Sequence, residues 1–218
     1  PYDRLSPDCV IDAVESAGYL CDARLLALNS YENRVYQVGI EDAQPLIAKF
    51  YRPGRWTDEQ ILEEHAFSLE LQDAEISVVA PLVDASGNSL HRHEGFRFAL
   101  FPRRGGYPPE LDNMDSLLVL GRTLGRIHTV GASARFRPTL SVENMLTHNR
   151  GYLLEHFIPR DLQPAYDSLT RDLLAVVLPL YGEVQDEDLI RVHGDCHIGN
   201  ILWRDDCAHF VDLDDCCM

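Results

Sequence analysis

A stretch rich in proline, glycine and arginine at residues 102–109 divides the chain into two parts with different hydrophobic patterns. Before this stretch, short segments in which apolar residues alternate predict strands, whereas after it the apolar residues recur mostly at helical spacing. We therefore expect an α+β protein with two lobes. The predicted N-terminal lobe covers residues 1–101, a hinge covers 102–109, and a mostly helical C-terminal lobe covers 110–218.

The N-terminal part predicts a sheet with two helices. Ser6 before Pro7 predicts the start of a helix over about 7–17. Thr57 and Gln60 predict a capping box for a second helix over about 58–72. The first three strands are expected to form an antiparallel meander, and the last two to flank a polar turn at 84–88. The five predicted strands lie near residues 23–29, 34–40, 46–51, 78–83 and 96–101.

The C-terminal part predicts helices followed by short strands. Asp112 or Asn113 is expected to cap a helix whose apolar face includes Leu120 and Ile127. A second long helix is predicted over about 161–181. Apolar residues with a period of two then predict short strands at 189–193, 201–203 and 209–212.

Composition excludes several classes of partner. The chain has 19 Lys and Arg against 35 Asp and Glu, a formal net charge of −16, so we expect no nucleic-acid partner. The longest apolar run, 173–181, is too short to span a membrane. Acidic residues among the first twenty positions argue against a secretory leader. We expect a cytoplasmic monomer in which the six cysteines are reduced thiols.

The most informative pattern is His-Gly-Asp-Cys-His-Ile-Gly-Asn at 193–200, followed by Asp-Leu-Asp-Asp at 212–215. Phosphoryl transfer from ATP needs a carboxylate that orients and deprotonates the acceptor hydroxyl, together with oxygen ligands for Mg²⁺. Asp195 suits the first role, and Asn200 and Asp212 suit the second. Asp195 and Asn200 also have the spacing of the base and the metal-binding Asn in the protein-kinase catalytic loop. A hairpin after Asn200 is expected to bring Asp212 back beside it.

The N-terminal part offers groups for the phosphates of ATP, which we expect to bind between the lobes near residues 98–104. Lys49 is the only lysine of the chain and lies within a predicted strand, where an unpaired charge is costly. On the next helix, Glu64 shares a face with apolar residues and is the favoured partner of Lys49, with Glu63 as the competing choice. The turn at 30–33 lacks the Gly-x-Gly-x-x-Gly pattern. Ser30 and backbone N–H groups are therefore expected to contact phosphate.

Five segments together resemble the stress response kinase A family, and the resemblance extends over nearly the whole chain. The segments are Asn-Ser-Tyr-Glu-Asn-Arg-Val-Tyr at 29–36, Lys-Phe-Tyr-Arg-Pro at 49–53, Ile-Leu-Glu-Glu-His at 61–65, residues 193–203, and Val-Asp-Leu-Asp-Asp at 211–215. The resemblance implies a bacterial cytoplasmic protein kinase with the aminoglycoside-phosphotransferase-like fold. It implies that ATP and Mg²⁺ are used to phosphorylate Ser or Thr of protein substrates. The protein itself is one candidate acceptor.

The resemblance also implies roles for individual residues. Asp195 is expected to accept the proton, Asn200 and Asp212 to bind Mg²⁺, and Ser30 to contact ATP. The roles of Lys49 and Glu64 follow from the pattern of the wider superfamily. Two departures are visible: one extra residue lies between 200 and the second acidic motif, and the helical C-terminal portion of the family is missing after residue 218. We therefore interpret the chain as a fragment.

Other functions remain open at this point. A small-molecule kinase of the aminoglycoside, choline or homoserine type uses the same catalytic loop. Asp195 with His193 and His197 would also suit a metallohydrolase, although that interpretation leaves Lys49 unexplained. A module that binds ATP without turnover is a third alternative. An H-x-H pair at 91–93 has the spacing of a zinc site, but no third ligand is evident in the sequence, which favours a solvated loop.

Overall fold

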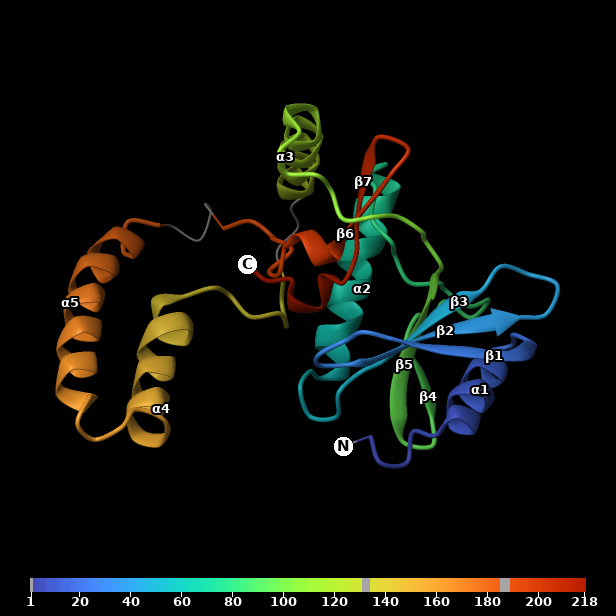
Figure 1. The fold of residues 1–218 in the computed structure, drawn as a ribbon, viewed down its shortest axis with the longest axis horizontal. Helices are drawn as coiled ribbons and strands as arrows, with labels where there is room; N and C mark the ends of the chain where they lie inside the picture. Colours follow the sequence, from blue (N-terminus) through green and yellow to red (C-terminus); the bar gives the residue numbers. More distant parts are fainter. Residues whose placement is uncertain (1, 131–133, 185–188) are drawn as a thin grey trace.

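The computed structural model describes residues 2–130, 134–184 and 189–218. A five-stranded antiparallel sheet, with the order β1-β2-β3-β5-β4, forms one end of the molecule (Figure 1). Its strands are β1 (Cys21–Leu28), β2 (Arg34–Ile40), β3 (Leu46–Phe50), β4 (His91–His93) and β5 (Phe96–Pro102). The predicted meander of the first three strands is confirmed.

The prediction of a strand at 78–83 is wrong. Val78 makes a single parallel bridge to Phe210, and the backbone N–H of Val79 donates to the Phe210 carbonyl at 3.0 Å. The start of this segment therefore pairs with the C-terminal part and not with the five-stranded sheet. The fifth strand is instead β4, which turns into β5 through Glu94 and Gly95, both with positive φ. Apolar alternation identified an extended segment but not the strand with which it pairs.

Helices cover both faces of the sheet, and each begins where the sequence predicts. In α1 (Pro7–Ser16) the hydroxyl of Ser6 accepts from the backbone N–H of Cys9 at 3.2 Å. In α2 (Asp58–Asp73) Thr57 and Gln60 form the predicted capping box. Alternating residues of β3 face opposite sides, so Ala48 and Phe50 pack with α1, whereas Tyr51, just beyond the strand, packs with α2. Lys49 therefore lies on the α2 side of the sheet.

His65 of α2 is a buried polar residue whose two ring nitrogens both have partners. Nε2 lies 2.7 Å from the Tyr51 hydroxyl and Nδ1 lies 2.8 Å from the Ser89 hydroxyl. Burial lowers the pKa of His65 from 6.5 to about 3, with a further contribution from Lys49. The imidazole is therefore neutral in the folded protein under ordinary conditions.

This depressed pKa predicts a pH-dependent stability. The unfolded chain binds a proton at His65 below pH 6.5, while the folded chain does so only below about 3. The free energy of unfolding should therefore fall as the pH decreases between these values, by up to about 1.4 kcal/mol per pH unit from this group. Urea unfolding at several pH values checks it: His65→Gln should lose this part of the slope, and His148→Gln, at an exposed histidine, should keep it. Equal slopes for all three proteins would contradict the prediction.

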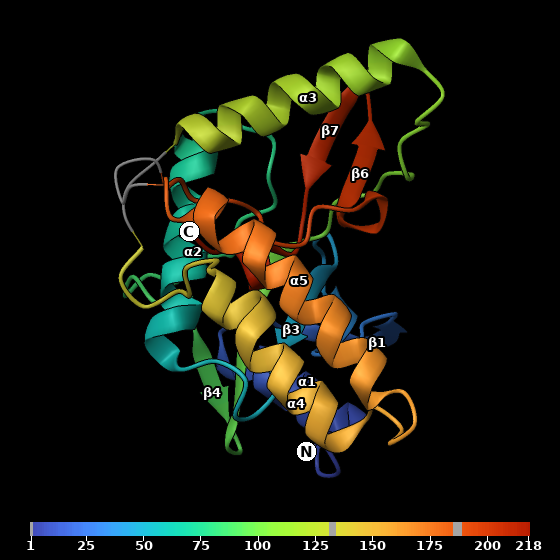
Figure 2. The ribbon, with the colours of Figure 1, turned by 90° about the vertical axis from the view of Figure 1, so that its left-hand side faces the viewer.

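The C-terminal part packs against the other side of α2. Asn113, one of the two predicted caps, accepts from the backbone N–H groups of Asp115 and Ser116 at the start of α3 (Met114–Thr129). α3 lies across a hairpin of β6 (Ile201–Arg204) and β7 (Cys207–Phe210) (Figure 2). The core shared by α2, α3 and the hairpin includes Phe67, Leu71, Ile127, Ile201, Phe210 and Leu213.

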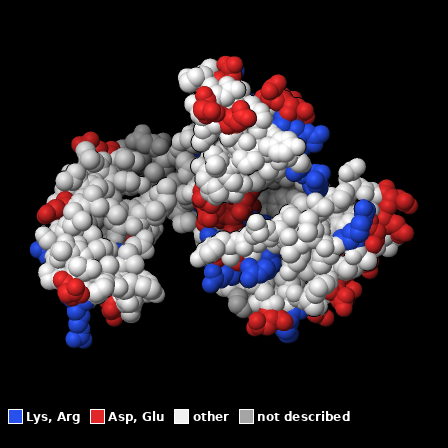
Figure 3. All heavy atoms as spheres, viewed as in Figure 1, with Lys and Arg blue, Asp and Glu red and all other residues white. Residues whose placement is uncertain are grey.

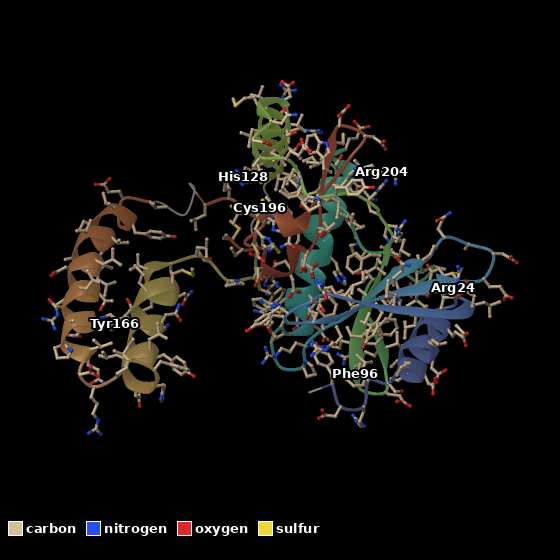
Figure 4. The ribbon with its side chains drawn as sticks, viewed as in Figure 1. Arg24, Phe96, His128, Tyr166, Cys196 and Arg204 are labelled. Carbon is tan, nitrogen blue, oxygen red and sulfur yellow. The ribbon has the colours of Figure 1, made fainter. Side chains whose placement is uncertain are left out.

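Two further helices stand apart from this core. α5 (Gln163–Tyr181) agrees with the predicted second helix, whereas α4 (His148–His156), which follows a π-helical turn at Glu143–Thr147, was not predicted. They form an antiparallel pair, and Tyr166 lies between them (Figures 1 and 4). No residue of α4 or α5 is buried, although every residue of both is described. Among the described residues, no helix has the length and apolarity to span a bilayer.

The strand predicted at 189–193 is reduced to one bridge. Val192 pairs with Cys217 through two backbone hydrogen bonds, of 2.9 and 3.2 Å. The chain then turns at Gly194, which has φ +84° and ends the pairing. Residues 215–217 thereby come next to the start of the loop at 193–200.

Candidate active site

A cavity of about 980 Å³ lies between the five-stranded sheet and the β6–β7 hairpin. Phe101 and Arg104, from the region expected to bind ATP, also line it. Figure 3 shows acidic side chains gathered in the hollow at the centre of this face. The structure brings all six predicted site residues to this cavity: Ser30, Lys49, Glu64, Asp195, Asn200 and Asp212.

Lys49 is buried among carboxylates on the wall formed by the sheet. Its Nζ lies 2.8 Å from Asp212 Oδ1, 3.3 Å from Asp214 Oδ1 and 4.0 Å from Glu64 Oε1. Burial opposes the charge, but these carboxylates outweigh it and raise the pKa of Lys49 well above 10.5. The ammonium of the only lysine in the sequence is therefore held charged inside the cavity.

Glu64, and not Glu63, points toward Lys49. Glu64 is 2% exposed and also accepts from the Tyr51 hydroxyl at 3.3 Å. Burial raises the pKa of Glu64 to about 7, although Lys49 opposes the shift. Glu63 turns away to the backbone of residues 135–137. The preference for Glu64 in the sequence rested on the apolar residues that share its helix face, and the structure agrees with it.

The loop at 193–200 begins with a buried residue, His193, and exposes the side chain of Asp195 to solvent. His193 is buried, with its Nε2 3.0 Å from the carbonyl of Val211. The Asp195 side chain is 53% exposed, and Cys196, beside it in the chain, marks the loop in Figure 4. Asn200, the last residue of a 3₁₀ turn (Ile198–Asn200), donates its amide to both the carbonyl and the carboxylate of Asp195, at 2.9 and 3.2 Å.

The hairpin places Asp212 beside Asn200, as expected from the sequence. The backbone N–H of Val211 donates to the Asn200 carbonyl at 3.0 Å, one step beyond the Ile201–Phe210 pair. Asp212 has left-handed backbone angles, with φ 58° and ψ 63°. Such angles are unfavourable for a residue with a side chain and are found at functional sites.

The donor set suits a hard divalent cation. The amide nitrogen of Asn200 is engaged by Asp195, which leaves its amide oxygen for a cation. The Asp212 carboxylate is half-exposed to the cavity. Amide and carboxylate oxygens are the ligands that Mg²⁺ and Ca²⁺ prefer.

Three residues that organise the site were not predicted from the sequence: Asn33, Arg55 and Asp214. Asp214 is buried and accepts from Asn33 Nδ2 at 3.2 Å and from Arg55 at 3.0 Å. Burial raises its pKa, but Lys49, Asn33 and Arg55 outweigh burial, so the pKa stays below 3.8. Asn33 belongs to the turn that contains Ser30, whose hydroxyl donates to the Asn33 carbonyl at 3.0 Å. The sequence gives one indication of the role of Asp214, its position two residues after Asp212 in the acidic motif.

The two metal-site alternatives have different outcomes. His193, Asp195 and His197 are not among the described side chains whose ligand atoms lie within 4.8 Å of one another, so they do not form a ligand set in this structure. At the other pair, the ring of His91 packs against Phe98. Contrary to the expectation of no third ligand, ligand atoms of His93, Cys9 and Glu94 lie within 4.8 Å of one another.

Known proteins resemble the chain in sequence and in fold. The sequence model of the phosphotransferase enzyme family matches residues 24–218. Stress response kinase A of Escherichia coli is 46% identical over 217 residues, and the serine/threonine protein kinase RdoA of Salmonella typhimurium is 42% identical. Each alignment covers 98% of this chain and 65% of the relative, so the chain spans 65% of their length.

Two solved kinases share the fold. Amicoumacin kinase hAmiN, in complex with AMP-PNP, Ca²⁺ and Ami, has a TM-score of 0.73 at 22% identity, over 99% of this chain and 65% of that one. A microcompartment-associated aminopropanol kinase has a TM-score of 0.72 at 20% identity, over 94% and 69%. The predicted α+β kinase-like fold is confirmed. Since the family match extends over most of the sequence, the chain belongs to the phosphotransferase enzyme family.

Proposed function

We propose that the protein is an ATP- and Mg²⁺-dependent kinase that transfers the γ-phosphoryl group to Ser or Thr of protein substrates in a bacterial stress response. The observation that carries this proposal is the convergence of Lys49, Asp195, Asn200 and Asp212 on one cavity. The names of the relatives, a stress response kinase and a serine/threonine protein kinase, support the protein acceptor.

On the sheet side, Lys49 is proposed to neutralise the phosphates of ATP and Glu64 to hold Lys49 in place. A charged ammonium in a cavity partly shielded from water interacts strongly with phosphate oxygens. Asp214, with Arg55 and Asn33, keeps the acidic motif close to this ammonium. Ser30 and its turn line the cavity and are proposed to contact phosphate.

On the loop side, Asp195 is proposed to orient the acceptor hydroxyl and to take its proton. The acceptor oxygen forms a bond to the γ-phosphorus as the bond from that phosphorus to the β–γ bridging oxygen breaks, and ADP leaves. The amide of Asn200 holds the Asp195 carboxylate in one orientation. Catalysis then consists mainly of positioning and charge stabilisation.

Asn200 and Asp212 are the residues proposed to hold Mg²⁺, which would neutralise charge on the phosphates. Asp212→Asn should raise the Mg²⁺ concentration that gives half-maximal activity by about tenfold, because the amide removes a charged oxygen ligand. A Mg²⁺ titration of activity after treatment with a chelator measures this. Asp206→Asn, in the exposed β6–β7 turn, is the matched control. An unchanged Mg²⁺ requirement in Asp212→Asn would exclude this carboxylate as a ligand.

The two lobes and their hinge remain part of the proposal. β5 ends at Pro102 and α3 begins at Met114, which leaves the segment between them as the connection. Phe101, near the end of β5, and Arg104, within this connection, line the cavity in the region proposed to bind ATP. We propose residues 1–101 and 110–218 as the lobes, with 102–109 as the hinge, in a monomeric protein.

The experiment that tests the function is transfer of labelled γ-phosphate from Mg·ATP by the full-length protein, with Asp195→Ala as control. Three kinds of acceptor are offered: the protein itself, a generic Ser/Thr protein substrate, and small amino alcohols and aminoglycosides. Label on protein that is lost in Asp195→Ala is the expected result. Label on small molecules alone would replace the protein acceptor with a small one. Binding of ATP without transfer to any acceptor would contradict a kinase.

A further inference from the structure

Glu63 of α2 makes an unusual set of contacts outside the cavity. Its carboxylate accepts the backbone N–H groups of Arg135, Phe136 and Arg137, at 2.5, 2.7 and 2.6 Å. Partial burial opposes ionisation, but these three hydrogen bonds and the nearby Arg137 charge hold the pKa of Glu63 below 4.5. Hydrogen bonds to an ionised acceptor are about twice as strong as neutral ones.

The same helix face contacts this segment a second time. Gln60 lies one turn before Glu63, and its side-chain amide donates to the Phe136 carbonyl at 3.0 Å. Residues 135–137 follow α3 and belong to the C-terminal part. Two side chains of α2 therefore bind three consecutive residues of a segment more than 70 positions away.

The segment that Glu63 binds is itself joined to the acidic motif. Arg137 is buried, donates from Nε to the Cys216 carbonyl at 2.8 Å, and donates from its terminal nitrogen to the Asp214 carbonyl. Its guanidinium lies 4.1 Å from the centre of the Trp56 ring, just before α2. Backbone bonds between 138–140 and Met218 extend the same junction.

These contacts connect α2, residues 135–137 and the acidic motif at 212–215 to one another around Lys49. Adjacent residues of a helix point about 100° apart, so Glu64 faces Lys49 while Glu63 faces residues 135–137. Arg137 in turn donates a hydrogen bond to the backbone carbonyl of Asp214. The carboxylate of Asp214 lies 3.3 Å from Lys49 Nζ. A rotation or shift of α2 would break the bonds of Glu63 and move Glu64 away from Lys49 together.

We propose that Glu63 is a positioning residue that fastens α2 to residues 135–137 and thereby holds Glu64 in reach of Lys49. This inference rests on the proposed function of Lys49 and Glu64. Glu63 is not among the residues that line the cavity, and its hydrogen bonds go to residues 135–137, which do not line it either. The effect of Glu63 on phosphoryl transfer should therefore depend on the presence of Glu64.

A double-mutant cycle tests this dependence in the full-length protein. Glu63→Gln should lower kcat/KM by about tenfold when Glu64 is present, because the amide cannot accept all three N–H groups. In the Glu64→Gln background the same change should lower kcat/KM by less than about twofold. Glu59→Gln, at an exposed position on the first turn of α2, is the matched control and should match the wild type.

Amide hydrogen exchange supplies a readout that does not depend on activity. The amides of residues 135–137 should exchange faster in Glu63→Gln, and the thermal midpoints should show that all variants are folded. Glu63→Asp, which keeps the charge, should recover part of the lost kcat/KM. A purely structural role would instead lower kcat/KM by the same factor in both backgrounds, and that result would overturn the proposal.

The remaining outcomes also decide the question. Unchanged exchange at 135–137, or full activity of Glu63→Gln, would show that α2 does not depend on this contact. If the wild type transfers no phosphate, the proposed function fails, and the cycle is measured on the dissociation constant of a non-hydrolysable ATP analogue. Coupling between Glu63 and Glu64 in that affinity would support positioning, and additive effects would overturn it.

Discussion

Replacing Asp195 with Asn should lower kcat for phosphoryl transfer by about 10³-fold and leave the affinity for Mg·ATP within about twofold of the wild type. The amide has nearly the shape of the carboxylate but cannot take the proton of the acceptor hydroxyl. The side chain is half-exposed and lies in the loop opposite Lys49. Nucleotide binding through the sheet side should therefore continue.

Single-turnover transfer and nucleotide titration measure the two quantities separately. Asp206→Asn, in the β6–β7 turn, makes the same chemical change at an exposed aspartate and should keep full activity. The hydrogen bond from Asn200 to the Asp195 carboxylate can be replaced by one to the amide oxygen, so the loop should keep its form. A variant that retains more than about one tenth of the wild-type kcat would rule out Asp195 as the base.

Gly194→Ala should destabilise the protein by at least about 3 kcal/mol. A Cβ at this position would lie 1.8 Å from the carbonyl oxygen of Asp215, so the backbone of one segment has to move. The two segments cannot separate easily, because Val192 and Cys217 are joined by two hydrogen bonds. The φ of +84° adds the strain of a left-handed backbone.

A substitution at Gly87 distinguishes the effect of the steric clash at Gly194 from the effect of its positive φ. Gly87 has φ +86°, and a Cβ added there would meet none of the described residues within 4 Å, so Gly87→Ala should cost only the strain, about 1–2 kcal/mol. Chemical denaturation of both variants measures the difference. Equal losses of stability would mean that the contact of Gly194 with Asp215 is unimportant. If Gly194→Ala does not fold, its yield of soluble protein beside that of Gly87→Ala gives the same comparison.

Much of the fold was predictable because its signals are local. The starts of α1, α2 and α3 follow from caps at Ser6, Thr57 and Asn113, whose side chains bond to N–H groups within the next three residues. The closeness of Asn200 and Asp212 follows from the short hairpin between them. Their catalytic roles, with those of Ser30, Lys49, Glu64 and Asp195, stay predictions until the variants are measured.

Other features depended on pairings that the local sequence does not encode. Residues 78–83 have a strand-like pattern, yet their backbone bonds go to β7 and β5 individually rather than to one strand. α4 has no buried face to reveal it by periodicity. The partners of Asp214 in the turn at 30–33 and of Glu63 at 135–137 lie far away along the chain.

The sequence by itself determined the change from strands to helices near 102–109, the caps of the main helices and the spacing of Asp195, Asn200 and Asp212. These depend on bonds and periodicities within a few residues. Only the tertiary structure decided that Glu64 faces Lys49 while Glu63 binds 135–137, and that Asp214 is buried with Lys49, Arg55 and Asn33. The physical reason is that a buried charge is stable only beside its partners, and those partners are brought together by packing.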